Sequence, residues 1–404
     1  MAPRSIVSLA IYQMLASNRI GVLAVFFPLF LVVDRGASVE VALIFSSAAF
    51  LGSSLVGPLA GRWSDRVGRR KPFLVGAELA ALPCLIAVPL LPDAVESGLA
   101  FISGLVILGI ASPALNAYIA DINQTRERGA SYGTLNAASG AGAIAGFLAV
   151  GVLITGFGLD YLFYFAAGVM ACVVVFAVIA LPDVAAMRSA RPNSYPRLGP
   201  LVFFSTAVSI RTLGLGAVGA FYALWTVSLG GSAFDVSLVA ISGLAVIAVV
   251  GLYAGRFVDR RGEYTALLLG TLIQLASWTA FLLATHWYVL PGAQALGQFG
   301  YVLLSPAMLV WVSRIAPPGR QAEYQGIFAL INSGFWSLGP TAGAVAFDLG
   351  GGHAVFLFAI LAGLVSLVLI TAFQSHYRGK FEAASGAIDV PPRPELAGLV
   401  SPPP

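Results

Sequence analysis

Long apolar stretches, separated by short breaks of charged residues, glycine and proline, occupy most of the chain. A helix needs about 20 apolar residues to cross the hydrocarbon core of a bilayer. Twelve stretches satisfy this length: 5–33, 39–61, 71–92, 97–120, 130–156, 160–181, 199–228, 234–256, 264–284, 288–313, 322–347 and 353–374. The pattern therefore predicts an all-α membrane protein with 12 transmembrane helices.

The composition supports this fold class and excludes several others. Hydrophobic residues make up 58% of the 404 residues and charged residues 10%, whereas soluble chains carry about 45–50% and about 25%. So few charges cannot cover a water-facing surface. Soluble enzymes, nucleic-acid-binding proteins and disordered proteins are therefore excluded as classes.

The positions of the basic residues give an orientation. Of the 22 lysine and arginine residues, 19 precede span 1, follow span 12 or lie in the breaks after even-numbered spans. Arg35 alone lies on the opposite side, and Arg19 and Arg211 lie within spans. Cytoplasmic loops collect lysine and arginine. We therefore expect both termini in the cytoplasm, in a bacterial or archaeal cytoplasmic membrane, and no nucleic-acid partner for the net charge of +4.

An internal repeat divides the chain into two halves. The segment 61–68 (GRWSDRVG) recurs as 255–262 (GRFVDRRG), and the segment 112–115 (SPAL) recurs as 305–308 (SPAM), both at an offset near 193 residues. Two pseudo-symmetric six-helix bundles are a known transporter architecture. We expect an N-terminal bundle at 1–181, a cytoplasmic linker at 182–198, a C-terminal bundle at 199–374 and a disordered cytoplasmic tail at 375–404.

The loop between spans 2 and 3 resembles the signature loop of the major facilitator superfamily (MFS). The resemblance rests on Gly61, Asp65, Arg66, Gly68, Arg69 and Arg70, with the weaker copy at Gly255, Asp259 and Arg260. It implies the MFS fold and a gating role for these residues, with Asp121 accepting bonds from the loop arginines. The alternative is that the loop charges only anchor the cytoplasmic side.

Two arginines occupy matching mid-span positions, Arg19 in span 1 and Arg211 in span 7. An arginine at the bilayer centre costs at least about 2.5–3.5 kcal/mol unless it faces protein, water or ligand. In the family that the chain resembles, spans 1 and 7 line the central cavity. We therefore expect the two guanidinium groups to bind one small anion between them. The alternative is that each guanidinium binds helix carbonyls, helped by Asn18, Ser209 or Thr212.

Other polar and aromatic side chains within the spans are candidates for the cavity wall, although an aromatic side chain in a span is more often part of the packing. The expected substrate-binding residues besides the two arginines are Asn18, Tyr12, Phe26, Asn116, Tyr222, Trp225, Gln298, Tyr301, Trp311, Asn332 and Trp336. Glu78 is the one acidic residue well inside a span. It is a candidate for proton coupling, and the alternative is that it pairs with a basic loop residue.

These observations predict a secondary transporter that moves a small organic or inorganic anion by alternating access. One alternative is proton-coupled efflux of sugars or amphiphilic drugs, and another is a non-transporting receptor or scaffold. The sequence contains no catalytic constellation and no cysteine–histidine cluster, so we expect neither an enzyme nor a metal or cofactor. The expected partners are the substrate, a coupling proton or counter-anion and the lipid bilayer, and we expect a monomer.

Overall fold

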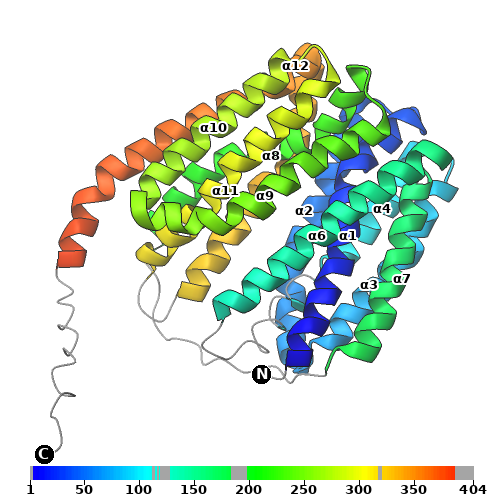
Figure 1. The fold of residues 1–404 in the computed structure, drawn as a ribbon, viewed down its shortest axis with the longest axis horizontal. Coiled ribbons are helices and arrows are strands. Elements are labelled where there is room, and N and C mark those ends of the chain that lie inside the picture. Colours follow the sequence, from blue (N-terminus) through cyan, green and yellow to red (C-terminus); the bar gives the residue numbers. More distant parts are fainter. Residues whose placement is uncertain are drawn as a thin grey trace, which may run out of the picture.

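The structure is a computed structural model, and it describes residues 3–111, 114–115, 118, 128–182, 198–316 and 321–386. Within these ranges the chain is built from helices, which Figure 1 shows as two adjacent groups. The first group comprises α1 (Pro3–Val33), α2 (Val39–Val67), α3 (Lys71–Leu90), α4 (Ala94–Leu108), α6 (Arg128–Phe157) and α7 (Tyr161–Ala180). We call this group the N half.

The second group, the C half, follows the same pattern of long helices joined by short turns. It comprises α8 (Gly199–Ser228), α9 (Ala233–Arg261), α10 (Glu263–Leu283), the short 3-10 helix η1 (Trp287–Val289), α11 (Leu290–Ile315) and α12 (Gln321–Gly386). The backbone of α12 leaves the helical conformation at Gly350 and Gly351, so α12 consists of two successive helices. Gly351 has a φ of +69°, which favours glycine.

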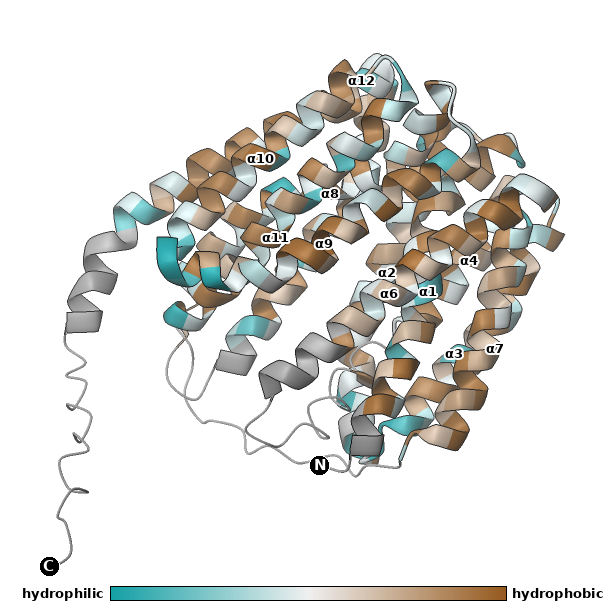
Figure 2. Cartoon of the chain, in the orientation of Figure 1, coloured by the Kyte–Doolittle hydropathy of each residue, from teal (hydrophilic) through white to brown (hydrophobic). Residues whose placement is uncertain are grey.

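Helix length and composition agree with the predicted spans. Among the described residues, ten helices are long and apolar enough to cross a membrane, and one of them, Tyr324–His376, is long enough for two crossings. Figure 2 shows hydrophobic colour along most of each helix and hydrophilic colour mainly at the ends. With α4 as a shorter apolar helix, these helices account for the predicted all-α fold.

Two boundaries differ from the sequence prediction. The described part of α4 ends at Leu108, and the helical residues after it (Ala111, Ala114, Leu115 and Tyr118) adjoin residues outside the described ranges. At the other end, α12 continues to Gly386, although we expected disorder from residue 375. The segment 375–386 contains glutamate, lysine and alanine and no proline, and these residues favour a helix.

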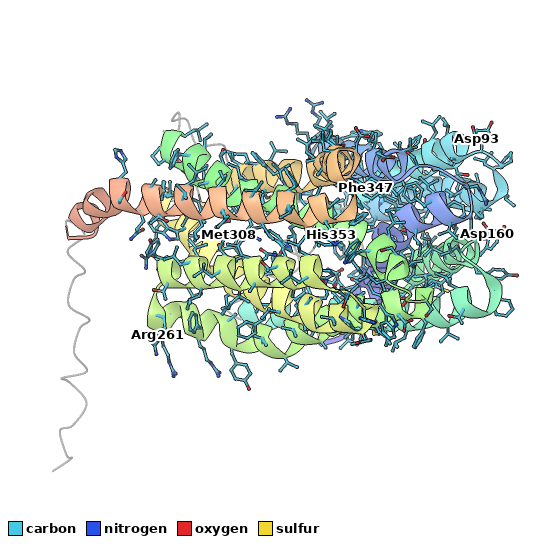
Figure 3. All side chains as sticks on the ribbon, turned by 90° about the horizontal axis from the view of Figure 1, so that it is seen from above. Asp93, Asp160, Arg261, Met308, Phe347 and His353 are labelled. Atoms are coloured by element: carbon cyan, nitrogen blue, oxygen red, sulfur yellow. The ribbon has the colours of Figure 1, made fainter. Side chains whose placement is uncertain are left out.

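The two ends of the helical bundle differ in charge. Figure 3 places Arg261 at one end and Asp93 and Asp160 at the other. We call the first end the basic face, because the signature-loop arginines at the end of α2 and their counterparts at the end of α9 lie there. We call the opposite end, where the turns α1–α2, α3–α4 and α6–α7 lie, the far face.

Among the described residues, the hydrophobic core is shared between the halves only toward the far face. There one cluster of buried side chains runs from α1 and α6 of the N half into α8 and α9 of the C half. Toward the basic face each half has a separate cluster, one around Tyr12 and Leu74 and the other around Phe204 and Val312. The halves are therefore joined at the far face and packed separately toward the basic face.

Direct contacts between the halves follow the same division. Ser47 of α2 donates a hydrogen bond to the Ser337 carbonyl oxygen of α12 over 2.5 Å. Phe50 packs edge-on against Trp336 with ring centroids 4.7 Å apart. These contacts lie in the far-face and middle thirds of α2, and they hold the two halves together beside the cavity described below.

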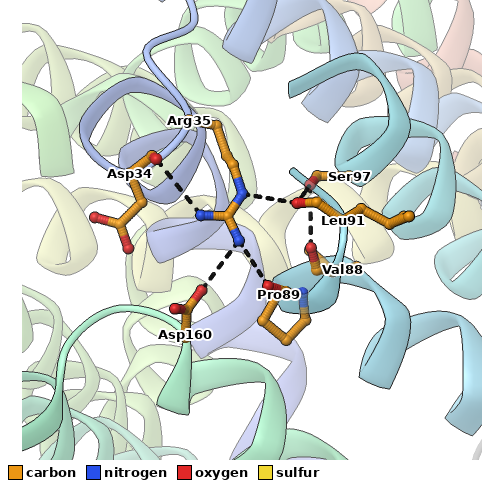
Figure 4. Close-up of polar contacts among 7 residues, drawn as sticks. All are labelled: Asp34, Arg35, Val88, Pro89, Leu91, Ser97 and Asp160. Atoms are coloured by element: carbon orange, nitrogen blue, oxygen red, sulfur yellow. Dashed lines mark hydrogen bonds and ion pairs between the residues drawn. The ribbon is translucent and has the colours of Figure 1, made fainter. Parts of the chain in front are cut away.

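Arg35, in the turn after α1, ties the far-face turns of the N half together (Figure 4). Its Nε donates to the Leu91 carbonyl oxygen over 3.1 Å, and its Nη2 donates to the Pro89 carbonyl oxygen over 2.7 Å and to Asp160 Oδ1 over 3.3 Å. The guanidinium also lies 4.6 Å from the centre of the Phe30 ring. The one basic residue that the sequence places on this side therefore joins three turns of one half.

Glycines in α6 allow this helix to pack closely against α1. A Cβ atom added to Gly146 would lie 1.9 Å from the Asn18 carbonyl oxygen, and one added to Gly142 would lie 1.9 Å from the Met14 carbonyl oxygen. A Cβ atom added to Gly140, on the same helix, would meet nothing within 4 Å. Small residues allow such close helix packing within membranes.

This contact gives a stability prediction with its own control. We expect Gly146→Ala to destabilise the protein by about 1–3 kcal/mol, because the backbone of α1 must move away from the new methyl group. Gly140→Ala should be neutral or slightly stabilising, because alanine favours a helix and the position is open. Thermal unfolding of the two purified variants in detergent measures the difference, and equal melting temperatures would contradict the close approach.

Candidate functional site

A cavity of about 500 Å³ lies between the two halves, on the basic-face side of their shared core. Helices α1, α2 and α6 contribute its N-half wall, and α8 to α12 contribute its C-half wall. This volume is within the range of pockets that enclose small organic molecules. The cavity is the candidate substrate site.

The C-half wall of the cavity carries the polar groups. Arg211, Thr212 and Tyr222 come from α8, Gln274 and Ser277 from α10, and the remaining polar residues from α11 and α12. The polar side chains of this wall include Arg211, Tyr222, Gln274, Gln294, Gln298, Tyr301 and Asn332. Among the described residues that line the cavity, arginine supplies a charge and no aspartate or glutamate is present.

The N-half wall is apolar. Its lining residues are Gly21, Ala24 and Val25 of α1, Phe50 of α2 and Phe147 of α6. A ligand in this cavity therefore meets hydrogen-bonding groups and one positive charge on one side, and aliphatic and aromatic surface on the other.

Arg211 is almost fully buried, with 1% of its surface exposed. Its Nη1 donates to Gln274 Oε1, and its Nη2 has no partner among the described residues. A glutamine side chain is neutral, so this hydrogen bond leaves the positive charge of Arg211 uncompensated. A buried cation with an unused donor at a cavity wall is suited to bind a hydrogen-bond acceptor, above all an anionic one.

Arg19 does not line this cavity, and here the structure differs from the sequence prediction of one site between two arginines. The guanidinium of Arg19 forms a buried ion pair with Glu78 of α3, and both side chains are at most 3% exposed. The physical reason is local. Glu78, seven residues into α3, lies beside Arg19 within the N half, and a buried charge pairs with the nearest opposite charge.

The other predicted binding residues divide into two groups. Tyr222, Gln298, Tyr301, Asn332 and Trp336 line the cavity together with Arg211. Tyr12, Phe26 and Trp311 belong to the packed cores, and Asn18 lies against Gly146 of α6. Trp225 donates through Nε1 to the Phe281 carbonyl oxygen and lines a second cavity of about 370 Å³ near Gly352. Asn116 lies outside the described residues.

The predicted gating loop lies at the basic face, as the sequence pattern places it. Gly68 ends α2 with a φ of +75°, and its N–H donates to the Ser64 carbonyl oxygen. Arg70 Nη1 donates to the Ser64 hydroxyl over 2.9 Å. The side chain of Asp65 and the whole of Asp121 lie outside the described residues, so the expected bonds between Asp121 and the loop arginines stay a prediction.

The charged side chains among the remaining predicted gating residues are exposed wherever the structure describes them. Arg66 and Arg69 are exposed in the first loop, and Asp259 and Arg260 are exposed in its copy. Gly61 and Gly255 lie in the last turns of α2 and α9. Among the described residues, no group of three or more histidine, cysteine, aspartate or glutamate side chains is placed to hold a metal ion.

Sequence reasoning missed Gln274, which holds Arg211, and Phe50, Phe147 and Gln294, which line the cavity. For Gln274 the sequence did contain a signal, the spacing of the internal repeat. It stands 196 residues after Glu78, close to the repeat offset, just as Arg211 stands 192 residues after Arg19. Each half therefore pairs an arginine of its first helix with a residue of its third helix, a carboxylate in the N half and an amide in the C half. The lining phenylalanines carry no such signal, because buried phenylalanines are common in any core.

A comparison with protein families identifies this fold. The family model of the Major Facilitator Superfamily matches residues 9–200 and 202–403. The chain belongs to the Major Facilitator Superfamily. It is thus an integral membrane protein of a transporter family, and the resemblance that rests on the loop between α2 and α3 is confirmed.

Two curated bacterial relatives in this superfamily cover most of the chain. Multidrug resistance protein 2 of Bacillus subtilis (strain 168) is 29% identical over 353 residues, which are 81% of this chain and 85% of that protein. The class D tetracycline resistance protein of Salmonella ordonez is 30% identical over 315 residues, which are 72% of this chain and 76% of that protein.

The fold of the MFS chain also matches solved transporters. A crystal structure of a mutant of the nucleoside transporter NupG superposes with a TM-score of 0.77 and covers 92% of this chain and 99% of that chain. The sequences are 14% identical, so this likeness concerns the fold alone.

Proposed function

We propose that this MFS transporter moves an amphipathic organic anion by alternating access, with the anionic group bound at Arg211 and the apolar body against the N-half wall. The observation that carries the proposal is the state of Arg211. It is a buried guanidinium at the cavity wall, held by a neutral amide and left with an unused donor.

The two walls of the cavity define the expected shape of the solute. Arg211 favours an acceptor with two neighbouring oxygen atoms, such as a carboxylate, sulfonate or phosphate, which accepts two parallel hydrogen bonds from a guanidinium. Phe50 and Phe147 on the opposite wall offer ring surface, which favours a flat apolar body. An inorganic anion uses only the first of these walls, so an organic anion fits the cavity better.

The packing of the halves supports alternating access, because it corresponds to one conformation of the transport cycle, closed at the far face. The shared core lies toward the far face, and the separate cores lie toward the basic face. If the basic face is cytoplasmic, as the distribution of lysine and arginine predicts, this state opens the cavity to the cytoplasm. The setting is then the cytoplasmic membrane of a bacterium or archaeon.

The second candidate function is export of amphiphilic drugs that carry no anionic group. The apolar N-half wall of the cavity favours it, and so do the names of the relatives, a multidrug resistance protein and a tetracycline resistance protein. In this case the charge of Arg211 does not select the substrate, and neutral or cationic amphiphiles are carried equally well.

Transport by purified protein in proteoliposomes separates these functions. Naphthalene-1-sulfonate is a suitable probe, because it combines an aromatic body with a charge that does not titrate. We expect saturable uptake into vesicles preloaded with the unlabelled compound, and no uptake into protein-free vesicles. If a neutral naphthalene amphiphile competes as well as the unlabelled sulfonate, the drug-export candidate is favoured and the anion proposal is wrong.

A further inference from the structure

The buried ion pair of the N half lies outside the substrate cavity. Arg19 and Glu78 are 1% and 3% exposed and contact each other within the membrane-spanning part of α1 and α3. The corresponding pair of the C half, Arg211 and Gln274, has no carboxylate. Of these two pairs, only the N-half pair therefore contains a carboxylate that can take up a proton.

The polar atoms around this pair are incompletely bonded. Glu78 Oε2, Arg19 Nε and Arg19 Nη1 are all buried and have no partner among the described residues. Buried polar atoms in proteins are almost always bonded to protein or to ordered water. Two unused donor positions of Arg19 and the unused oxygen of Glu78 thus define a site for water, and water is the carrier by which a proton reaches a buried acid.

We propose that the Arg19–Glu78 pair is a proton-binding site, separate from the substrate cavity, that sets the electrostatic potential of the cavity. Glu78 takes the proton from water at Oε2, and the ion pair becomes a neutral acid beside a cation. No covalent bond other than this O–H bond forms. Without the proton the pair has no net charge, and with the proton Arg19 is uncompensated.

The position of Arg19 links this proton to the solute. Arg19 stands two residues before Gly21, and Gly21, Ala24 and Val25 are the residues through which α1 lines the cavity. An uncompensated charge at this position raises the electrostatic potential of the cavity, and low-dielectric surroundings screen it weakly. Proton binding and anion binding therefore strengthen each other, and the proton travels in the same direction as the anion. This inference rests on the proposed function.

Other titratable groups near the pair are few among the described residues. Tyr12 of α1 and Tyr118, beyond the described end of α4, belong to the same cluster of buried side chains as Ala77. Of the helices that pack on α3, α4 carries Glu96 and α7 carries Tyr161, Tyr164 and Cys172, and all four side chains are exposed. Arg19 is the charged group whose field acts on Glu78. A proton that binds at this pair is therefore assigned to Glu78.

Equilibrium binding of naphthalene-1-sulfonate to the purified full-length protein tests the inference between about pH 5 and about pH 8. The charge of this probe is constant in that range, so a pH effect reports the protein. For the wild type we expect binding to be about five-fold tighter or more at the acidic end. For Glu78→Gln we expect tight binding at every pH, because Arg19 is then always uncompensated.

The double variant Arg19→Gln with Glu78→Gln keeps a neutral hydrogen-bonded pair and avoids an unpaired buried charge. We expect its binding to be weak and independent of pH. The matched control is Glu96→Gln, an exposed acid at the start of α4, which should retain the wild-type pH profile. If Glu78→Gln does not fold, the pH dependence of binding in the wild type and in the double variant still tests the inference.

The outcomes separate this inference from the proposed function. If the wild type binds the sulfonate with the same affinity at every pH, the proton site is wrong and the anion site stands. If the double variant retains the wild-type pH profile, the proton binds elsewhere and the inference is likewise wrong. If the wild type does not bind the sulfonate at any pH, the proposed function itself fails.

Discussion

Replacement of Arg211 by glutamine is expected to lower the uptake of naphthalene-1-sulfonate by about 10- to 100-fold, because a charge-assisted hydrogen bond contributes about 1.5–3 kcal/mol. Glutamine retains a hydrogen-bond donor and much of the side-chain length, so the change removes mainly the charge. Initial uptake rates in proteoliposomes of equal protein content measure the effect.

The control for this variant is Arg256→Gln, which removes an exposed arginine at the basic face. We expect its initial uptake rate to stay within about two-fold of the wild-type rate, because exposed surface charges contribute little. Equal losses of uptake in both variants would mean that overall positive charge, and not the cavity arginine, governs transport.

Replacement of Gln274 by glutamate is expected to lower anion uptake near neutral pH to a similar extent. The new carboxylate lies where Gln274 Oε1 accepts from Arg211 Nη1, and it copies the arrangement that Glu78 makes with Arg19. The guanidinium then binds its internal partner in place of the solute. Uptake measured over a range of pH should recover at acidic pH, where the new carboxyl group is protonated.

Gln294→Glu is the matched control for this second variant. It adds the same charge to the same cavity wall, at a residue that makes no described contact with Arg211. A general effect of negative charge would reduce uptake equally in both variants. Direct pairing predicts a much larger loss for Gln274→Glu, so equal losses would contradict the role of Gln274 as the neutral partner of Arg211.

Sequence patterns predicted the helical framework well because bilayer thickness sets the length of each apolar stretch. The repeat and the signature loop indicated the family, which the family model confirms. The helical segment after residue 375 was not predicted, since no membrane constraint applies there. Helix propensity, which decides such a segment, is a weaker signal.

The candidate site was only partly predictable. Hydropathy identified Arg19 and Arg211 as costly residues within spans, but it could not say which partner each would find. That depends on which residue of the third helix in each half lies alongside, Glu78 in one case and Gln274 in the other. The carboxylate of Glu78 compensates the charge of Arg19, whereas the neutral amide of Gln274 leaves the charge of Arg211 available to a solute.

The most direct test of the central claim is a binding cycle with two proteins and two ligands. The proteins are the wild type and Arg211→Gln, and the ligands are naphthalene-1-sulfonate and its uncharged sulfonamide. We predict that the wild type prefers the sulfonate by about ten-fold or more and that this preference disappears in the variant. Equal affinity of the wild type for both ligands, or a preference that persists without Arg211, would contradict the proposal that Arg211 recognises an anion.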